Sequence, residues 1–292
     1  MGLKKAISKR VHKARMVGAV VKDSFLVNVK RPIKKRRFYS SQLKAVIVDL
    51  DGTLLETDSS LEALKLFFPE KIKGLTKGEL IYGRLINAVI DGTMSVDEAM
   101  VFGLKKLIEK EFSTDDLEMV FEFVKPKIRM QLAESLKLIQ KGMNAKIILA
   151  TMSSKKFAEL INKHLSEEIG FEFDAVLGSE ILFEKGKAKK LIKIIGKETK
   201  QIGEIQAKSK FDAIQDLLNE KKWNYSLNEL LFITDGYGDI EVIKKMPSIL
   251  LTQKENASLI QTVSKRLRLA DFIVQDDENL KEQIVKIVLG TK

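Results

Sequence analysis

The sequence predicts an α/β fold: a Rossmann-like parallel sheet flanked by helices, with a helical cap subdomain inserted into it. Short apolar runs rich in β-branched residues recur along the chain, as in strands that are buried on both faces. Amphipathic helical patterns separate these runs, and this alternation is typical of βαβ units. One long stretch after the first run contains helical patterns without a strong strand pattern, which indicates the insertion.

The strands of the predicted core are short apolar runs, several of which end in polar residues. The first covers residues 44–50 (KAVIVDL). Similar runs follow at residues 145–150, 229–234 and 248–252, and a short edge strand is predicted at residues 272–274. Helical patterns lie between them at residues 155–166, 208–222 and 239–245. We therefore assign residues 44–55 and 142–292 to an α/β core.

The cap is predicted over residues 56–141. Its amphipathic patterns cover residues 61–68, 79–90, 95–108 and 115–124. Gly92 and Pro126 are turn-forming residues that punctuate the stretch. We expect a separate helical subdomain, placed like a lid after the first strand of the core.

Residues 1–43 form a basic leader. Residues 1–44 contain 14 of the 51 Lys and Arg side chains and one acid, Asp23, whereas the other 248 residues are close to neutral. Apolar residues recur at helical spacing from Leu3 to Val21, which favours a basic amphipathic helix. Anionic lipid headgroups or RNA phosphates suit such a segment, and a solvated tail or a targeting segment are the alternatives.

The composition excludes several classes of site and of protein. The chain has no cysteine, so disulfides, thiolate-bound metals and a cysteine nucleophile are excluded. It has two histidines, too few for a histidine-rich metal site. No apolar run approaches the roughly 18 residues that cross a bilayer. We expect a soluble, cytoplasmic protein, with the leader as a candidate for peripheral attachment to a membrane.

Carboxylates follow two of the predicted strands. Asp49 and Asp51 follow the first strand, and Asp235 and Asp239 follow the strand at residues 229–234. Side chains two residues apart in an extended chain point the same way, so Asp49 and Asp51 are expected to share one small space. Carboxylates this close repel each other unless a cation or a shared proton compensates. Oxygen ligands favour a hard cation, so we predict Mg²⁺ at these four acids.

Such a cluster suits phosphoryl transfer. One carboxylate can attack phosphorus once Mg²⁺ reduces the phosphate charge, and a second can protonate the leaving oxygen and then activate water. A hydroxyl and a lysine would hold the phosphate oxygens. Thr151 offers the hydroxyl, beside the amide of Met152, and either Lys208 or Lys210 offers the lysine.

These residues resemble the four motifs of the haloacid dehalogenase superfamily of aspartyl-phosphate enzymes. The matching positions are DLDGT at 49–53, Thr151 after a strand, Lys210 at the start of a helix, and TDGYGD at 234–239. The resemblance covers about residues 44–280. It implies a phosphatase or phosphomutase, because the dehalogenase members lack an acid at the position of Asp51.

The resemblance also implies roles for the residues of the motifs. Asp49 would be the nucleophile and Asp51 the general acid and base. The Asp49 carboxylate, the Asp51 backbone carbonyl and Asp235 would bind Mg²⁺, with support from Asp239. The residues expected beside the substrate are Gly52, Thr53, Asp58 and Met152.

The position of the cap and the place of Asp58, nine residues after Asp49, are most similar to the phosphoserine-phosphatase-like branch of the superfamily. An acid at this place can contact a substrate amine in that branch. The chain departs from the branch after the second motif, where Met152, Ser153 and Ser154 replace a glycine-rich stretch. Thr234 likewise stands where glycine is usual.

The leading hypothesis is a Mg²⁺-dependent phosphomonoester hydrolase that acts on a small phosphorylated metabolite through an aspartyl-phosphate. A phosphomutase with the same carboxylates and a helical cap is the second hypothesis. A third, of another class, is a weakly catalytic phosphate-binding module that the leader recruits to a membrane or to RNA.

Overall fold

The computed structural model of the chain describes residues 38–236, 239–253 and 270–290. Most of the predicted basic leader therefore lies outside the described residues. The last residues of the leader are described and contain a 3-10 turn, η1, at Ser40–Gln42. Phe38 contacts Phe272 edge to face, with the ring centroids 5.6 Å apart.

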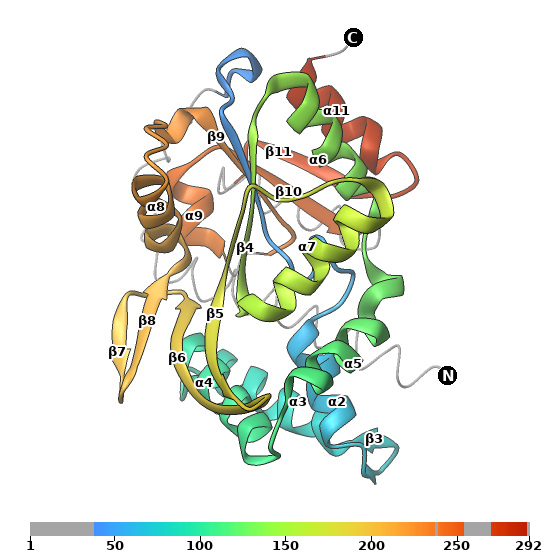
Figure 1. Cartoon of the computed structure of the whole chain (residues 1–292), viewed down its shortest axis with the longest axis vertical. Helices are drawn as coiled ribbons and strands as arrows, with labels where there is room; N and C mark the ends of the chain where they lie inside the picture. Colours follow the sequence, from blue (N-terminus) through green and yellow to red (C-terminus); the bar gives the residue numbers. More distant parts are fainter. Residues whose placement is uncertain (1–37, 237–238, 254–269, 291–292) are drawn as a thin grey trace.

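Parallel strands form the centre of one twisted sheet (Figure 1). The predicted strands are β1 (Ala45–Val48), β4 (Lys146–Ser154), β9 (Leu230–Thr234), β10 (Ser248–Gln253) and β11 (Phe272–Asp276). Within the described residues the sheet has the order β11-β10-β9-β1-β4-β5-β6-β8-β7, so β11 is an edge strand as predicted. The predicted fold class is confirmed.

The register of the central strands brings their polar ends together. Val48, the last residue of β1, pairs with Leu149 of β4 and with Ile233 of β9. Because the three strands are parallel, the residues that follow these positions emerge at the same edge of the sheet. The candidate site residues therefore lie at this edge.

Alternate residues of the strands pack into two different cores. Val46 and Val48 face a large core that helices α6 (Met130–Met143), α7 (Lys155–Ile169) and α11 (Leu280–Leu289) cover. Ala45 and Ile47 face a second core under α8 (Lys210–Glu220) and α9 (Ile240–Lys245). Burial on both faces explains why these strands read as unbroken apolar runs.

Four strands beyond β4 were not predicted from the sequence. They are β5 (Ala175–Glu184), β6 (Lys187–Gly196), β7 (Lys200–Ile202) and β8 (Ile205–Ser209). β5 and β6 form an antiparallel hairpin, and β6 pairs in parallel with β8. Lysines interrupt the apolar residues of β6, so its sequence shows neither a continuous apolar run nor a regular alternation. Tertiary packing of Leu191 and Ile194 against Val101 of the cap compensates for this weak pattern.

The predicted helical insertion forms four helices at one end of the sheet (Figure 1). They are α2 (Ser59–Phe67), α3 (Lys77–Ile90), α4 (Val96–Glu109) and α5 (Thr114–Val124), with a small hairpin of β2 (Lys71–Ile72) and β3 (Leu75–Thr76) between α2 and α3. Capping boxes at Thr76, Ser95 and Ser113 begin α3, α4 and α5.

The end of the insertion differs from the prediction of residues 56–141. A 3-10 turn, η2, at Lys125–Lys127 follows α5, and α6 then packs along α11 beside the sheet. Residues 130–143 therefore lie with the core. The amphipathic pattern of α6 is the same whether its apolar side faces a cap or a sheet, so the sequence did not distinguish the two.

The cap contacts the core on two sides. At its base, Glu56 donates its N–H to the carbonyl of Lys127, at 2.9 Å. On the other side, Ala188 of β6 donates its N–H to the carbonyl of Phe112, at 2.7 Å, and buried Asp97 of α4 accepts the N–H of Lys197, at 2.7 Å. A further bond, from the N–H of Ser59 in α2 to Oδ1 of Asp51, places this first cap helix at the polar edge of the sheet.

In the part of the chain that the structure describes, no helix combines the length and the apolar character that a bilayer-spanning segment requires.

Candidate active site

The chain turns sharply after β1, and this turn carries the first motif. Gly52 adopts a φ of +80°, in the left-handed region. A Cβ atom at Gly52 would lie 2.2 Å from Oδ2 of Asp235, so a side chain there would clash as well as strain the backbone. The glycine therefore allows the loop after β1 to approach the loop after β9.

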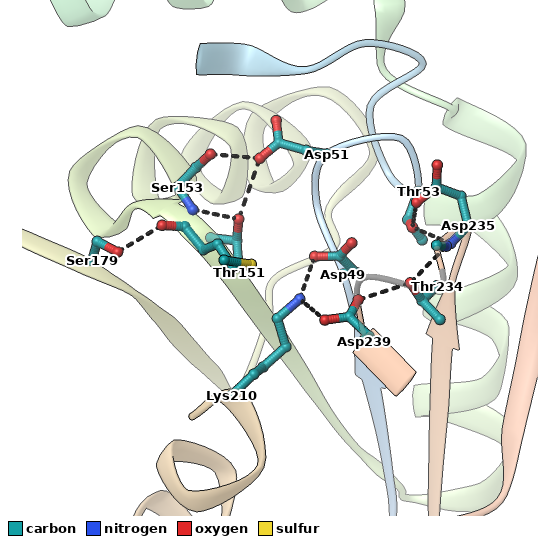
Figure 2. Close-up of polar contacts among 12 residues, drawn as sticks. Asp49, Asp51, Thr53, Thr151, Ser153, Ser179, Lys210, Thr234, Asp235 and Asp239 are labelled. Atoms are coloured by element: carbon teal, nitrogen blue, oxygen red, sulfur yellow. Dashed lines mark hydrogen bonds and ion pairs between the residues drawn. The ribbon is translucent and has the colours of Figure 1, made fainter. Parts of the chain in front are cut away.

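Thr53 holds these two loops together. Its buried hydroxyl accepts the N–H of Asp235, at 2.8 Å, and donates to Oδ1 of the same residue, at 3.4 Å. In the structure the hydroxyl of Thr53 places Asp235 (Figure 2). Its predicted role in substrate binding stays a prediction.

Lys210 lies between two carboxylates in the interior. Its ammonium is 2.9 Å from Oδ1 of Asp49 and 2.7 Å from Oδ1 of Asp239, and the residue is 4% exposed (Figure 2). Burial opposes the positive charge, but Asp239 and Asp49 outweigh burial and raise the pKa of Lys210. The lysine is therefore a fixed positive charge beside Asp49.

The sequence left Lys208 and Lys210 as alternatives for this position. Lys208 lies in β8, pairs with Asp216 and does not share the neighbours of Lys210. Lys210 is the first residue of α8, after the N-cap residue Ser209, so the helix start aims it at the end of β1. The structure brings Lys210, and not Lys208, to Asp49.

Burial is the main cause of an elevated pKa at Asp49. The carboxyl is buried, which raises its pKa well above the ordinary value, and the ammonium of Lys210 acts in the opposite direction. The negative charges of Asp239 and Asp235 raise it further. The environment of Asp49 thus contains more negative than positive charge.

Asp51 has a different set of neighbours. Its Oδ1 accepts the N–H of Ser59, at 2.7 Å, and its Oδ2 accepts the hydroxyl of Ser153, at 2.5 Å. The hydroxyl of Thr151 is a longer donor to Oδ2, at 3.5 Å. Burial, and after it the charge of Asp58, raises the pKa of Asp51 to about 6, against the effect of these hydrogen bonds.

The expectation that Asp49 and Asp51 share one small space rested on an extended backbone. β1 ends at Val48, and the chain turns from Leu50 onward, so the alternation of side chains stops there. Asp49 faces Lys210, whereas Asp51 faces the hydroxyls of β4 (Figure 2) and accepts the N–H of Ser59 from the cap. The two acids flank the end of β1 with separate partners.

The fourth motif is built around Thr234, the residue that replaces the usual glycine. Its hydroxyl donates to Oδ2 of Asp239, at 2.9 Å, and accepts the N–H of Gly236, at 3.1 Å. Asp239 therefore uses one oxygen for Thr234 and the other for Lys210. Asp239 acts on the site through the lysine, and Asp235 is the acid of this motif that lies against the loop of Gly52.

Asp58 begins the first cap helix. Its Oδ1 accepts the N–H groups of Ser60 and Leu61, at 3.0 and 3.1 Å, as an N-cap residue does. Its Oδ2 accepts the phenol of Tyr82 from α3, at 2.7 Å. The predicted contact of Asp58 with a substrate amine would have to compete with these bonds.

Met152 contributes its backbone to the site. Its carbonyl accepts the hydroxyl of Ser179 in β5, at 2.6 Å, and Ser179 in turn accepts the N–H of Ile195 in β6, at 3.1 Å. The unpredicted strands β5 and β6 thus fix the end of β4 that follows Thr151. Ser153 lies in the same end of the strand and donates its N–H to the hydroxyl of Thr151, at 3.0 Å.

Arg129 is a residue whose role the sequence did not reveal. It is buried, and its Nη1 donates to the carbonyls of Gly52, Thr53 and Leu55, at 2.6, 2.6 and 3.0 Å. Its Nε donates to Asp276 at the end of β11, at 2.9 Å. The arginine therefore braces the loop that carries Asp51 from behind. Its distance of 76 residues from Thr53 left no local pattern that could reveal this.

The donors at the end of β1 fit a hard divalent cation. The carboxylates of Asp49 and Asp239 share one ammonium, and the charge of Asp235 also acts on Asp49, so the site holds surplus negative charge and every available donor is an oxygen. Among the described residues, no three side chains of His, Cys, Asp and Glu form a ready ligand group. A set of two carboxylates, Asp49 and Asp235, with the backbone carbonyl of Asp51 agrees with both observations.

Comparison with known proteins adds a family and a fold. A sequence model described as haloacid dehalogenase-like hydrolase matches residues 46–244. Curated protein sequences contain no match.

Solved structures with a similar fold include phosphatases. A phosphoserine phosphohydrolase-like protein from Francisella tularensis is 16% identical, with a TM-score of 0.53 over 80% of this chain and 95% of the other. A probable phosphoserine phosphatase from Vibrio cholerae is 12% identical, with a TM-score of 0.57 over 88% and 69%. Cytosolic 5'-nucleotidase IIIB bound to cytidine is 10% identical, with a TM-score of 0.51 over 86% of each chain. At these identities the similarity establishes the fold, which hosts different substrates.

Proposed function

Because the chain belongs to the haloacid dehalogenase-like hydrolase family, we propose that it is a Mg²⁺-dependent phosphomonoester hydrolase that forms an aspartyl-phosphate on Asp49. One observation carries this proposal. Buried Lys210 bridges Asp49 and Asp239 at the polar edge of the sheet, and Asp51 lies beside them with its pKa raised to about 6. A nucleophile with a fixed cation, next to an acid that titrates near neutrality, is the set that phosphoryl transfer through a carboxylate requires.

In the first half of the proposed reaction, a carboxylate oxygen of Asp49 attacks phosphorus and the ester oxygen leaves. Lys210 holds positive charge beside Asp49 and the phosphate oxygens, where negative charge develops in the transition state. The hydroxyl of Thr151 and the amide of Met152 are the neutral donors of the same site. Lys210 cannot move away, because Asp239 fixes its other side.

Asp51 transfers protons in both halves of the proposed reaction. The protonated carboxyl gives its proton to the leaving oxygen, so an alcohol departs and Asp51 becomes a carboxylate. The carboxylate then takes a proton from water as the water oxygen attacks the phosphorus on Asp49. Phosphate leaves, Asp49 is a free carboxylate again and Asp51 is again protonated. A pKa of about 6 makes both states accessible near neutral pH.

The Asp49 and Asp235 carboxylates and the Asp51 backbone carbonyl would hold the Mg²⁺. The cation supplies positive charge that allows an anionic carboxylate to approach an anionic phosphate. Thr53 supports this arrangement because its hydroxyl oxygen accepts the N–H of Asp235, at 2.8 Å, and so holds Asp235 in place.

For the substrate we propose a small phosphorylated metabolite. The cap reaches the site itself, since Ser59 of α2 donates its N–H to Asp51, and this proximity supports a small substrate. The fold is similar to that of phosphoserine phosphatases, but the acid at position 58 already caps α2 and accepts the phenol of Tyr82. We therefore do not extend the proposal to phosphoserine.

Phosphate release from p-nitrophenyl phosphate tests the proposal. We expect release with Mg²⁺, none with EDTA, and none from Asp49→Asn, which keeps the size of the side chain and removes the nucleophile. Asp174→Asn is the matched control, because Asp174 lies at the start of β5 and away from the site, and it should keep its activity. An active Asp49→Asn enzyme would rule out the aspartyl-phosphate.

A further inference from the structure

Two serines connect Asp51 to both parts of the molecule. Ser153 lies near the end of β4 and donates its hydroxyl to Oδ2 of Asp51, at 2.5 Å. Ser59, the first residue of cap helix α2, donates its N–H to Oδ1 of the same carboxyl, at 2.7 Å. The hydroxyls of the two serines are 2.9 Å apart in the interior. The core, the cap and the acid of the first motif thus meet in one hydrogen-bonded group.

We propose that Ser153, with Ser59 behind it, positions the carboxyl of Asp51 for proton transfer to the leaving oxygen. The inference rests on the proposed function and adds two positioning residues to it. Neither serine belongs to the four motifs, and Ser153 stands where the chain departs from a glycine-rich stretch. A glycine could not make this contact, since it has no hydroxyl.

A hydroxyl suits a carboxyl that gives and receives a proton. When Asp51 is ionised, Ser153 donates to it and Ser59 donates to Ser153. When the reacting proton is on Oδ1 of Asp51, Ser153 still donates to Oδ2, because each carboxyl oxygen has its own acceptor sites. The contact is therefore kept on both sides of the step in which the proton of Asp51 moves to the leaving oxygen.

The contacts also restrict the direction of the carboxyl. Oδ1 is held by a backbone N–H of the cap and Oδ2 by a side chain of β4, so rotation of the carboxyl would break at least one bond. Both donors are buried and sit on regular elements, α2 and β4. Reaction geometry of this kind depends on supports that do not move.

The adjacent Ser154 provides a matched control. Ser153 and Ser154 are both 9% exposed and are the last two residues of β4. The hydroxyl of Ser154 makes no hydrogen bond within the part of the chain that the structure describes. Ser153→Ala and Ser154→Ala remove the same atom, but only the first removes a contact with Asp51.

Leaving-group dependence separates positioning of the acid from general damage. p-Nitrophenolate leaves readily without being protonated. Phenolate is a poorer leaving group, so its departure depends more strongly on a proton from the general acid. For Ser153→Ala we expect kcat/KM to fall about tenfold more on phenyl phosphate than on p-nitrophenyl phosphate. This is smaller than the rate loss expected when a general acid is removed entirely, because Asp51 itself remains. Ser59→Ala should change this ratio in the same direction by a smaller factor, because its N–H remains. Ser154→Ala should leave the ratio unchanged.

The ratio is taken within one variant, so a lower fraction of folded protein does not alter it. Equal losses on both substrates in Ser153→Ala, or the same change of ratio in Ser154→Ala, would overturn the inference while the proposed function stands. Absence of Asp49-dependent phosphate release from the wild type would overturn both.

Discussion

Asp49 and Asp51 are two residues apart, but their surroundings differ in kind. The neighbours of Asp49 are charged: Lys210 at 2.9 Å, with Asp239 and Asp235 behind it. The closest neighbours of Asp51 are neutral donors: the hydroxyl of Ser153 and the N–H of Ser59. The first set comes from the core alone, and the second from the core and the cap.

This difference follows from where the elements end. β9 and the helix α8 deliver acids and a lysine to one side of the β1 loop, whereas β4 and α2 deliver serines to the other side. A fixed charge suits a group that must remain an ionised nucleophile, and adaptable hydroxyls suit a group that exchanges a proton. Substitutions on the two sides should therefore have different consequences.

The largest effect is expected on the charged side. Lys210→Met removes the cation between two buried carboxylates and leaves both unpaired, which should lower the free energy of unfolding by about 3 kcal/mol. Phosphate release should fall by about 10²–10³-fold, because the charge beside the nucleophile is lost. Steady-state kinetics and thermal unfolding measure the two losses.

Lys208→Met is the control for this prediction. Lys208 pairs with Asp216, whose side chain is half exposed, so its removal should cost little stability or activity. Equal losses in the two lysine variants would contradict the distinction between Lys208 and Lys210.

The sequence revealed the charged side better than the neutral side. Asp49, Asp235 and Asp239 follow strands that read as apolar runs, so their position at one edge could be predicted. The sequence did not distinguish Lys210 from Lys208 as the lysine of the site, because the distinction depends on the residue at which α8 begins. Ser59, Ser153 and Arg129 act through contacts 74 to 147 residues apart in the chain, except for the bond of Ser59 to Asp51, and no local pattern encodes such contacts.

The fold shows the same division. The strands buried on both faces were predicted from their short apolar runs and from the helical patterns between them. β6 mixes lysines and apolar residues without a regular alternation and packs against α4, so its state depends on the cap. Residues 130–141 fell within the predicted cap without a helix of their own, whereas they form most of α6 beside the sheet. Periodicity identifies an apolar face, and only tertiary structure identifies what covers it.

A smaller effect is expected on the neutral side, in the metal-free protein. Asp51 has its pKa raised from 3.8 to about 6, so the folded state binds a proton more readily than the unfolded chain. The ionised carboxyl then destabilises the fold above about pH 6, and this penalty disappears as the pH falls through 6 toward 4. Asp51→Asn should raise the free energy of unfolding in EDTA at pH 7.5 by about 1–2 kcal/mol, and the gain should vanish near pH 4.

Asp174→Asn is expected to show the opposite sign. Burial opposes ionisation of Asp174, but hydrogen bonds from Lys146, the N–H of Ile147 and Gln140 outweigh it and lower its pKa. This carboxylate therefore stabilises the fold at neutral pH, and the stabilisation is lost as the pH falls through its lowered pKa. Denaturant unfolding of both variants between pH 4 and 7.5 measures the signs. A lower free energy of unfolding in Asp51→Asn at pH 7.5 would contradict the conclusion that burial destabilises the ionised form of Asp51.

The smallest effect on catalysis is expected from the basic leader. The contacts described for both acids come from residues 59 to 239, so removal of residues 1–37 should leave kcat/KM on p-nitrophenyl phosphate within about twofold of the full chain.

The same truncation removes 13 of the 51 basic side chains and should abolish sedimentation with vesicles that contain anionic lipid, without an effect on neutral vesicles. An RNA of random sequence, added to the same assay, identifies the other anionic partner that the leader suits. Equal sedimentation of the full and truncated chains, with vesicles and with RNA, would contradict the prediction that the leader binds an anionic partner.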